Sequence, residues 1–86
     1  MNPTPSAPLT RLSELAVGTP ALIHGIAEAA PANVSMRLRH LGFRTGNAVQ
    51  PLRVAPLGDP TVYRILGYDL CLRRHEACHI QVEVTP

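Results

Sequence analysis

The sequence predicts a small, mainly β domain with one short α-helix, folded as a partly open antiparallel barrel of five strands. The chain has 86 residues, with one phenylalanine, two tyrosines and no tryptophan. It therefore forms one domain whose small core is mostly aliphatic. One segment has helical spacing, and short apolar runs separated by turn residues follow it. A barrel would hide most of the sheet edges that such short strands expose.

The N-terminal region divides into a leader and an entry segment. Residues 1–8 carry three prolines and little to bury, so we predict a disordered leader, followed by a single domain over residues 9–86. In residues 9–21, LTRLSELAVGTPA, we expect Leu12, Leu15 and Val17 to dock on the core. The first strand falls in residues 20–29, PALIHGIAEA, where Gly25 suits a bend or a close backbone contact.

The helix is predicted in the stretch that runs to RLRHLGFRTG. Asn33 is a good N-cap, and Gly42 stands where a left-handed residue ends a helix. Phe43 would then contact Leu38 in a Schellman ending. The apolar stripe that faces the core consists of Val34, Leu38 and Leu41.

The C-terminal half has the spacing of short strands. Turn residues at 56–60, 67–68 and 75–77 separate predicted strands at 47–55, 61–66, 69–73 and 78–84. Pro51 places its strand at an edge or at a bulge, because proline cannot donate to a ladder. In the last strand the core-facing residues would be Cys78, Ile80 and Val82, and the solvent-facing ones His79, Gln81 and Glu83.

Composition and charge exclude several classes of function. The formal charge of +2 comes from eight arginines against six carboxylates, mixed along the chain. Mixed charge and few aromatic residues argue against nucleic acid as a partner. The first residues carry no basic signal region, and no apolar run is long enough to insert into a membrane. We therefore expect a cytoplasmic domain, in which Cys71 and Cys78 are free thiols.

Two clusters are candidate sites. On the outward face of the predicted helix lie Met36, Arg39 and His40, with Arg37 at its border; this face is either simply solvated or a contact surface for a protein. The second cluster, CLRRHEACH, holds the possible metal ligands Cys71, His75, Glu76, Cys78 and His79. These side chains suit zinc or ferrous iron, but strand alternation splits them between two sides. A closed site in one chain is therefore less favoured than a low-affinity site that uses His75, Glu76 or His79, either on the surface or between two chains.

Four blocks carry a resemblance to a known family. LSELAVG, RLRHLGFRTG, VAPLGDP and LCLRRHEACHIQV, in this order, make residues 12–84 similar to the FeoA family of small SH3-like proteins of bacterial ferrous iron transport. The resemblance implies a cytoplasmic accessory protein without enzyme activity or a required cofactor. It also implies a partner, the FeoB-type transporter with its cytoplasmic GTPase domain. The sequence contains no glycine-rich phosphate-binding loop and no nucleophile beside an orienting base, so we predict no catalytic residues.

The charged positions within these blocks leave alternatives open. Arg37, Arg73 and Arg74 are candidates to bind an acidic partner surface. In the alternative, Arg37 or Arg73 pairs within the chain with Asp59 or Glu76. An arginine supplied in trans to the GTPase is a further alternative, although no motif supports it. The function favoured by the sequence is docking on the transporter and promoting its activity. The runner-up is a transition-metal-binding regulatory module, and short barrel edges leave a homodimer open.

Overall fold

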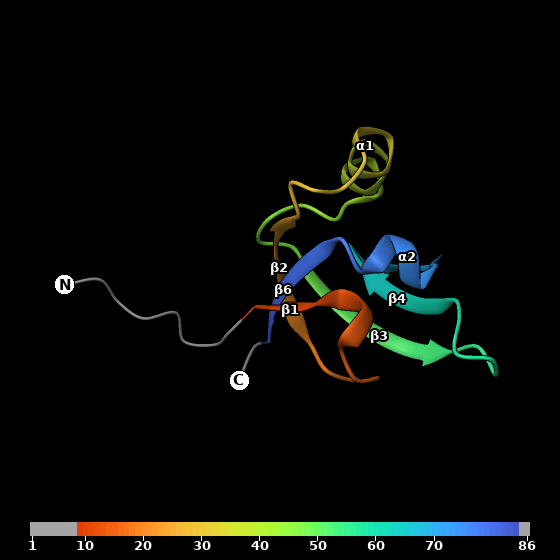
Figure 1. Cartoon of the computed structure of the whole chain (residues 1–86). Helices are drawn as coiled ribbons and strands as arrows, with labels where there is room; N and C mark the ends of the chain where they lie inside the picture. Colours follow the sequence, from red (N-terminus) through yellow and green to blue (C-terminus); the bar gives the residue numbers. More distant parts are fainter. Residues whose placement is uncertain (1–8, 85–86) are drawn as a thin grey trace.

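The computed structural model describes residues 9–84, so the predicted leader lies outside the described residues. Its centre is one antiparallel sheet (Figure 1). The strand order is β1-β6-β2-β3-β4-β5, so β1 and β5 are the two ends. The elements are β1 (Leu9–Arg11), the 3-10 turn η1 (Leu12–Glu14), β2 (Ala21–Ile26), α1 (Ala32–Leu41), β3 (Ala48–Val54), β4 (Thr61–Ile65), β5 (Tyr68–Leu72), α2 (Arg74–Ala77) and β6 (Ile80–Val84).

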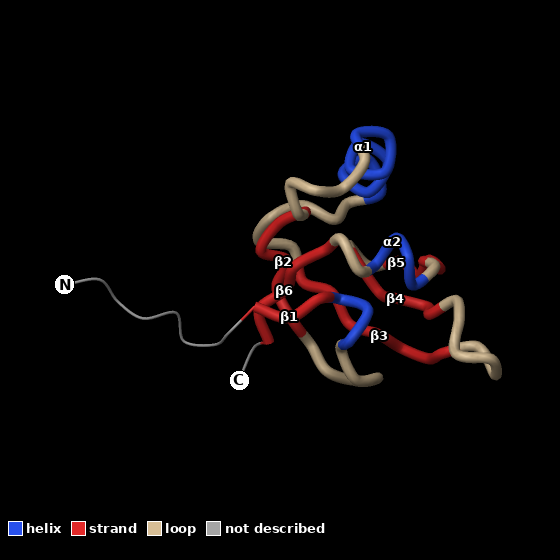
Figure 2. Tube along the Cα trace, in the orientation of Figure 1, coloured by secondary structure: helices blue, strands red, loops and turns tan. Residues whose placement is uncertain are grey.

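The predicted class, mainly β with a partly open antiparallel sheet, is confirmed, and two elements add to it. The sheet has six strands rather than five, because Leu9–Arg11 in the expected entry segment pairs with β6. The expected turn at 75–77 is the single helical turn α2. Figure 2 shows α1 beyond the upper end of β2, apart from α2.

Two irregular positions curve the sheet. The register between β2 and β6 shifts between Ile23 and Gly25, as expected for a bend at that glycine. The register between β3 and β4 shifts between Pro51 and Arg53. Since β3 lies inside the sheet, the bulge, and not an edge, is what accommodates Pro51.

The core is one cluster that joins residues of η1, α1, α2 and strands β2 to β6. Leu12 is fully buried and Leu15 packs against the core, as predicted, but Val17 is 51% exposed. The prediction for Val17 was wrong because the chain turns away there, at residues 17–18. The buried hydrophobic residues of this core are Leu12, Ala21, Ile23, Leu38, Phe43, Val49, Tyr63, Ile65, Leu72, Ala77, Ile80 and Val82.

Helix α1 ends as predicted but begins differently. Its N-cap is Pro31, whose carbonyl accepts the Ser35 N–H at 2.9 Å, so the prediction of Asn33 as N-cap was wrong. At the other end Gly42 has φ +109°, and the Phe43 N–H donates to the Leu38 carbonyl at 3.0 Å. The predicted stripe is confirmed, since Leu38 is fully buried while Val34 and Leu41 pack against the core.

The β4–β5 hairpin holds the end of α1 against the sheet. Its two-residue turn, Leu66–Gly67, has φ +51° and +84°, as in a type I′ turn. The Tyr68 hydroxyl donates to the Leu41 carbonyl at 2.7 Å. Beside it Leu66 lies over Gly42, where an added Cβ would come 2.6 Å from Leu66 Cδ1. The hairpin therefore fixes where the helix leaves the core.

Candidate functional site

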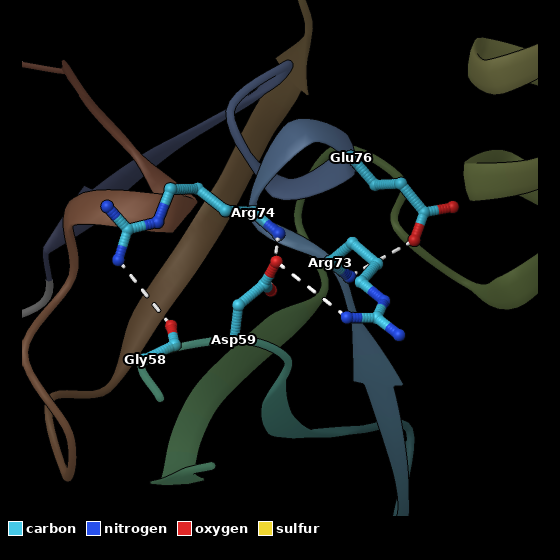
Figure 3. Close-up of polar contacts among 5 residues, drawn as sticks. All are labelled: Gly58, Asp59, Arg73, Arg74 and Glu76. Atoms are coloured by element: carbon cyan, nitrogen blue, oxygen red, sulfur yellow. Dashed lines mark hydrogen bonds and ion pairs between the residues drawn. The ribbon is translucent and has the colours of Figure 1, made fainter. Parts of the chain in front are cut away.

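A cluster of charged residues surrounds the start of α2 (Figure 3). The Asp59 carboxylate accepts the Arg74 backbone N–H at 2.9 Å, and the Glu76 carboxylate accepts the Arg73 N–H at 3.1 Å. The Arg74 guanidinium donates to the Gly58 carbonyl at 3.5 Å. Two carboxylates thus satisfy N–H groups that a helix start leaves without partners.

The arginines of this cluster also form ion pairs. Arg37 on α1 pairs with Glu76, and Arg73 lies 4.0 Å from the Asp59 carboxylate. The alternative that Arg37 and Arg73 pair within the chain is therefore confirmed. Their side chains remain 53% and 60% exposed, so each pair is worth only about 0 to 1 kcal/mol.

The outward face of α1 differs from this cluster. Met36 is 58% exposed, and Arg39 and His40 are exposed and, within residues 9–84, have no salt-bridge partner. These side chains line an open groove of about 610 Å³ between α1 and the segment that follows β2. Ile26 forms part of its wall. We call this feature the α1 groove.

Arg44 also lines the α1 groove, although the sequence interpretation did not select it. The chain reverses after Gly42, and the Arg44 Nε–H donates to the Arg39 carbonyl at 3.2 Å. A basic residue just beyond a helix end often donates to the last helical carbonyls, and this position in the sequence could have indicated Arg44. The groove therefore carries three cationic or titratable side chains, from Arg39, His40 and Arg44, beside one carboxylate, from Glu28.

The predicted metal ligands are not gathered into one site. Among the described residues no group of three or more His, Cys, Asp or Glu side chains could hold a metal ion. Cys71 is exposed on β5 and His75 is exposed on α2, whereas His79 is half-buried just before β6. Glu76 already bonds Arg73 and Arg37. This arrangement does not fit a metal centre built by one chain.

The two cysteines are free thiols, as predicted. The prediction that Cys78 faces the core from the last strand was wrong: it is the half-buried C-cap of α2, and β6 begins only at Ile80. Its Sγ donates to the His75 carbonyl at 3.2 Å. Ile80 and Val82 are fully buried, so the core-facing alternation is confirmed from Ile80 onward.

One titratable group lies behind the charged cluster. Tyr63 is only 2% exposed, and burial raises its pKa above the ordinary value of 10.0. Asp59 raises the pKa further, whereas a hydrogen bond with Thr61 and the charge of Arg74 lower it. The phenol therefore stays protonated and neutral in the folded protein at neutral pH.

No helix within residues 9–84 is both long enough and apolar enough to cross a membrane. Comparison with known proteins shows that residues 10–84 match the family model of the FeoA domain. The chain belongs to the FeoA family. This match covers all the elements described above except the first residue of β1.

Individual relatives agree with this assignment. Over 74 residues the chain is 38% identical to a fusion of Fe(2+) transport protein A with Fe(2+) transporter FeoB from Porphyromonas gingivalis, covering 86% of this chain and 8% of the fusion. The solution structure of iron(II) transport protein A from Clostridium thermocellum is 37% identical, with a TM-score of 0.82 over 88% of this chain and 46% of that one. The FeoA chain therefore spans a small part of the fusion and about half of the clostridial protein.

A third relative bears on the fold and on metal. The crystal structure of FeoA from Stenotrophomonas maltophilia, described as a prokaryotic SH3 domain protein complexed with zinc, is 29% identical. The TM-score is 0.76, over 86% of this chain and 89% of that one. The predicted SH3-like fold is confirmed. FeoA membership associates the chain with ferrous iron transport.

Proposed function

We propose that this FeoA domain is a non-enzymatic cytoplasmic accessory module that docks through the α1 groove on the cytoplasmic part of a FeoB-type ferrous iron transporter and promotes its activity. The observation that carries the proposal is the groove itself, where exposed Met36 lies beside Arg39 and His40. The fused relative supports the choice of partner, because fusion keeps the two proteins together.

The chemistry of the groove favours an acidic segment with an apolar side chain. Met36 is flexible and half-exposed, so it suits an anchor that packs on an apolar residue of the partner. The guanidinium of Arg39 has no carboxylate partner among the described residues, so binding an acidic surface breaks no internal ion pair. Arg44 extends the positive charge along the same wall.

The remaining candidates for partner binding, Arg37, Arg73 and Arg74, have internal contacts. Arg37 and Arg73 would give up ion pairs with Glu76 and Asp59, and Arg74 would give up its bond to Gly58. We therefore propose that these three arginines shape the domain and contribute to docking only at the rim of the contact. Supply of an arginine to GTP hydrolysis remains a further hypothesis for the exposed guanidinium groups.

Calorimetric titration tests the proposal, with the transporter's isolated GTPase domain and its full-length form, each with and without guanine nucleotide. We expect saturable binding, weakened at least about tenfold by Met36→Ala with Arg39→Glu. Arg53→Glu is the matched control, because it makes the same charge change at an exposed residue of β3 outside the groove. Equal binding by both variants, or no binding by the wild type, would overturn the proposal.

The transition-metal module is the second candidate, and the zinc-complexed relative favours it. Because one chain does not gather the ligands, such a site would be shared between two chains, using His75, His79, Glu76 or the thiols of Cys71 and Cys78. This hypothesis predicts stoichiometric zinc or ferrous iron retention that His75→Ala with His79→Ala abolishes. Retention unchanged by that double substitution, or no retention, would exclude it.

A further inference from the structure

Strand β5 forms one end of the sheet, and among the described strands it pairs only with β4. The pairing runs through five consecutive residues without a bulge. The other end of the sheet, β1, has only three residues. Proteins usually protect a sheet edge with charged side chains, proline or a bulge. Strand β5 has no proline, lysine or bulge, and its one charged residue, Asp69, is paired with Arg64. Its open edge is therefore available for strand pairing.

The turn type determines which backbone groups of β5 are free. A two-residue type I′ turn makes Ile65 and Tyr68 a hydrogen-bonded pair, and antiparallel ladders alternate from there. Leu70 then bonds to β4, whereas the N–H and C=O groups of Asp69 and Cys71 point away from it. Both of these residues are exposed. The free edge thus offers two donors and two acceptors.

These free groups are complementary to a second copy of the same edge. If two β5 strands pair antiparallel about a two-fold axis at Leu70, Asp69 of each copy lies opposite Cys71 of the other. All eight outward groups then form four hydrogen bonds. A register centred on Cys71 would place Asp69 opposite Arg73, whose N–H and C=O groups are already bonded within α2. A register centred on Asp69 would place Cys71 opposite Gly67, which lies in the turn with φ +84°.

The side chains agree with this register. Asp69 would lie diagonally across from Arg73 of the second copy, a separation that a long arginine side chain spans. The Arg73 guanidinium is 60% exposed, and its internal partner is 4.0 Å away. Asp69 also pairs with Arg64 at 3.0 Å, which offsets part of its repulsion of Asp69 in the second copy, its other diagonal neighbour. Each contact occurs twice across the axis.

We propose that the chain forms a homodimer by edge-to-edge pairing of β5, centred on Leu70. This dimer is independent of docking on a transporter, since the α1 groove is built from α1 and the segment after β2. Two five-residue edges make a small contact, so the dimer is weak, with a dissociation constant of about 10 to 100 µM.

Sedimentation velocity over a range from about 5 to 500 µM tests the proposal, and we expect a concentration-dependent shift from monomer to dimer. Cys71→Pro removes an outward N–H without removing a bond to β4, so we expect a folded monomer at every concentration. A wild type that stays monomeric throughout would overturn the proposal, as would an undiminished dimer of a folded Cys71→Pro variant.

Exchanging the charges of Asp69 and Arg73 tests the dimer even if the Cys71→Pro variant disturbs β5. Asp69→Arg faces Arg73 of the second copy, and we expect dimerisation to weaken at least about fivefold. Asp69→Arg combined with Arg73→Asp restores opposite charges, and we expect most of the dimer to return. Recovery is the decisive result, because an intrachain effect of either change would accumulate in the double variant. Failure to recover would contradict this register.

The two cysteines report where the copies meet. In the proposed register the Cys71 residues of the two copies are diagonal neighbours, with Cα atoms about 7 to 8 Å apart. A short bis-maleimide should therefore cross-link Cys78→Ser dimers, which keep Cys71, but not Cys71→Ser dimers, which keep only Cys78. The reverse pattern would place the interface elsewhere on the molecule and overturn the proposal.

Discussion

Glu76 is the residue whose removal should most directly show how α2 is held. Its carboxylate, with a side chain only 13% exposed, accepts the Arg73 N–H and pairs with Arg37 of α1. Glu76→Ala removes both interactions at once. Loss of a helix-start acceptor costs about 0.5 to 2 kcal/mol, and loss of an exposed ion pair costs about 0 to 1 kcal/mol. We expect the free energy of unfolding to fall by about 1 to 2 kcal/mol.

The two interactions are separable by substitution. Glu76→Gln keeps an amide oxygen that accepts the Arg73 N–H but loses the charge that attracts Arg37, so it should cost less than about 1 kcal/mol. Arg37→Ala removes the ion pair alone and should cost about the same. Glu76→Ala should therefore destabilise the domain more than Glu76→Gln, and Arg37→Ala should destabilise it about as much as Glu76→Gln.

Thermal unfolding followed by far-ultraviolet circular dichroism measures these differences. For a domain of this size about 1 kcal/mol corresponds to roughly 4 to 8 °C in Tm, which resolves Glu76→Ala from Glu76→Gln. A double-mutant cycle of Arg37→Ala with Glu76→Ala gives the coupling between the two side chains. The reasoning would be refuted if Glu76→Gln destabilised as much as Glu76→Ala, because the ion pair would then dominate over the hydrogen bond.

Three further predictions concern Tyr63, Gly42 and Tyr68. Because burial raises the Tyr63 pKa, the folded state favours the protonated phenol; its contribution to stability is complete below about pH 10 and is lost as pH rises through the folded pKa. Tyr63→Phe should remove this alkaline decrease in the free energy of unfolding, and a variant with the same pH dependence as the wild type would contradict the prediction. Gly42→Ala should destabilise the domain more than Gly46→Ala, because both glycines have positive φ but only at Gly42 would the added Cβ contact Leu66. Equal urea unfolding midpoints for the two variants would contradict this contact. Tyr68→Phe should cost about 0.5 to 1.5 kcal/mol and speed amide exchange in the last turn of α1, and unchanged exchange there would argue against the tether to Leu41.

The elements that the sequence predicted are those specified locally. Gly42 and Phe43 end α1 within a few residues of one another, and Pro51 causes a bulge in its own strand. The elements it missed depend on distant residues. The helical turn α2 takes one of its N–H partners from Asp59, fifteen positions upstream of Arg74, and no spacing rule reports such a contact. Strand β1 is too short to show alternation and exists because β6 lies beside it.

The candidate site also has some residues that local sequence could predict and others that depend on the path of the chain. The outward position of Met36 and Arg39 follows from the helical period alone and needs no tertiary information. The part played by Arg44 depends on where the chain goes after Gly42, so the period could not indicate it. The ligands in CLRRHEACH are close in sequence but lie on β5, on α2 and before β6, and the changes of direction between these elements keep them from gathering.

Four charged residues from three of the family blocks converge on one place. Arg37 comes from the helix block, Asp59 from the turn block, and Arg73 and Glu76 from the C-terminal block, yet all four meet around the start of α2. Their contacts connect α1, the turn after β3 and α2, so these charges first hold the fold together. Charge reversal at Arg37 or Arg73 should therefore lower stability and partner binding together.

Reversal at Arg39 breaks no ion pair among the described residues, so it should lower binding alone. A binding loss at Arg37 becomes evidence for a contact only after the loss of folded protein has been subtracted. A loss at Arg39 needs no such correction. Measured side by side at a temperature well below both unfolding transitions, the two variants separate residues that build the domain from residues that its partner touches. If the corrected losses were equal, the α1 groove would not be the centre of the contact, and the docking surface would extend across α1 to the charged cluster.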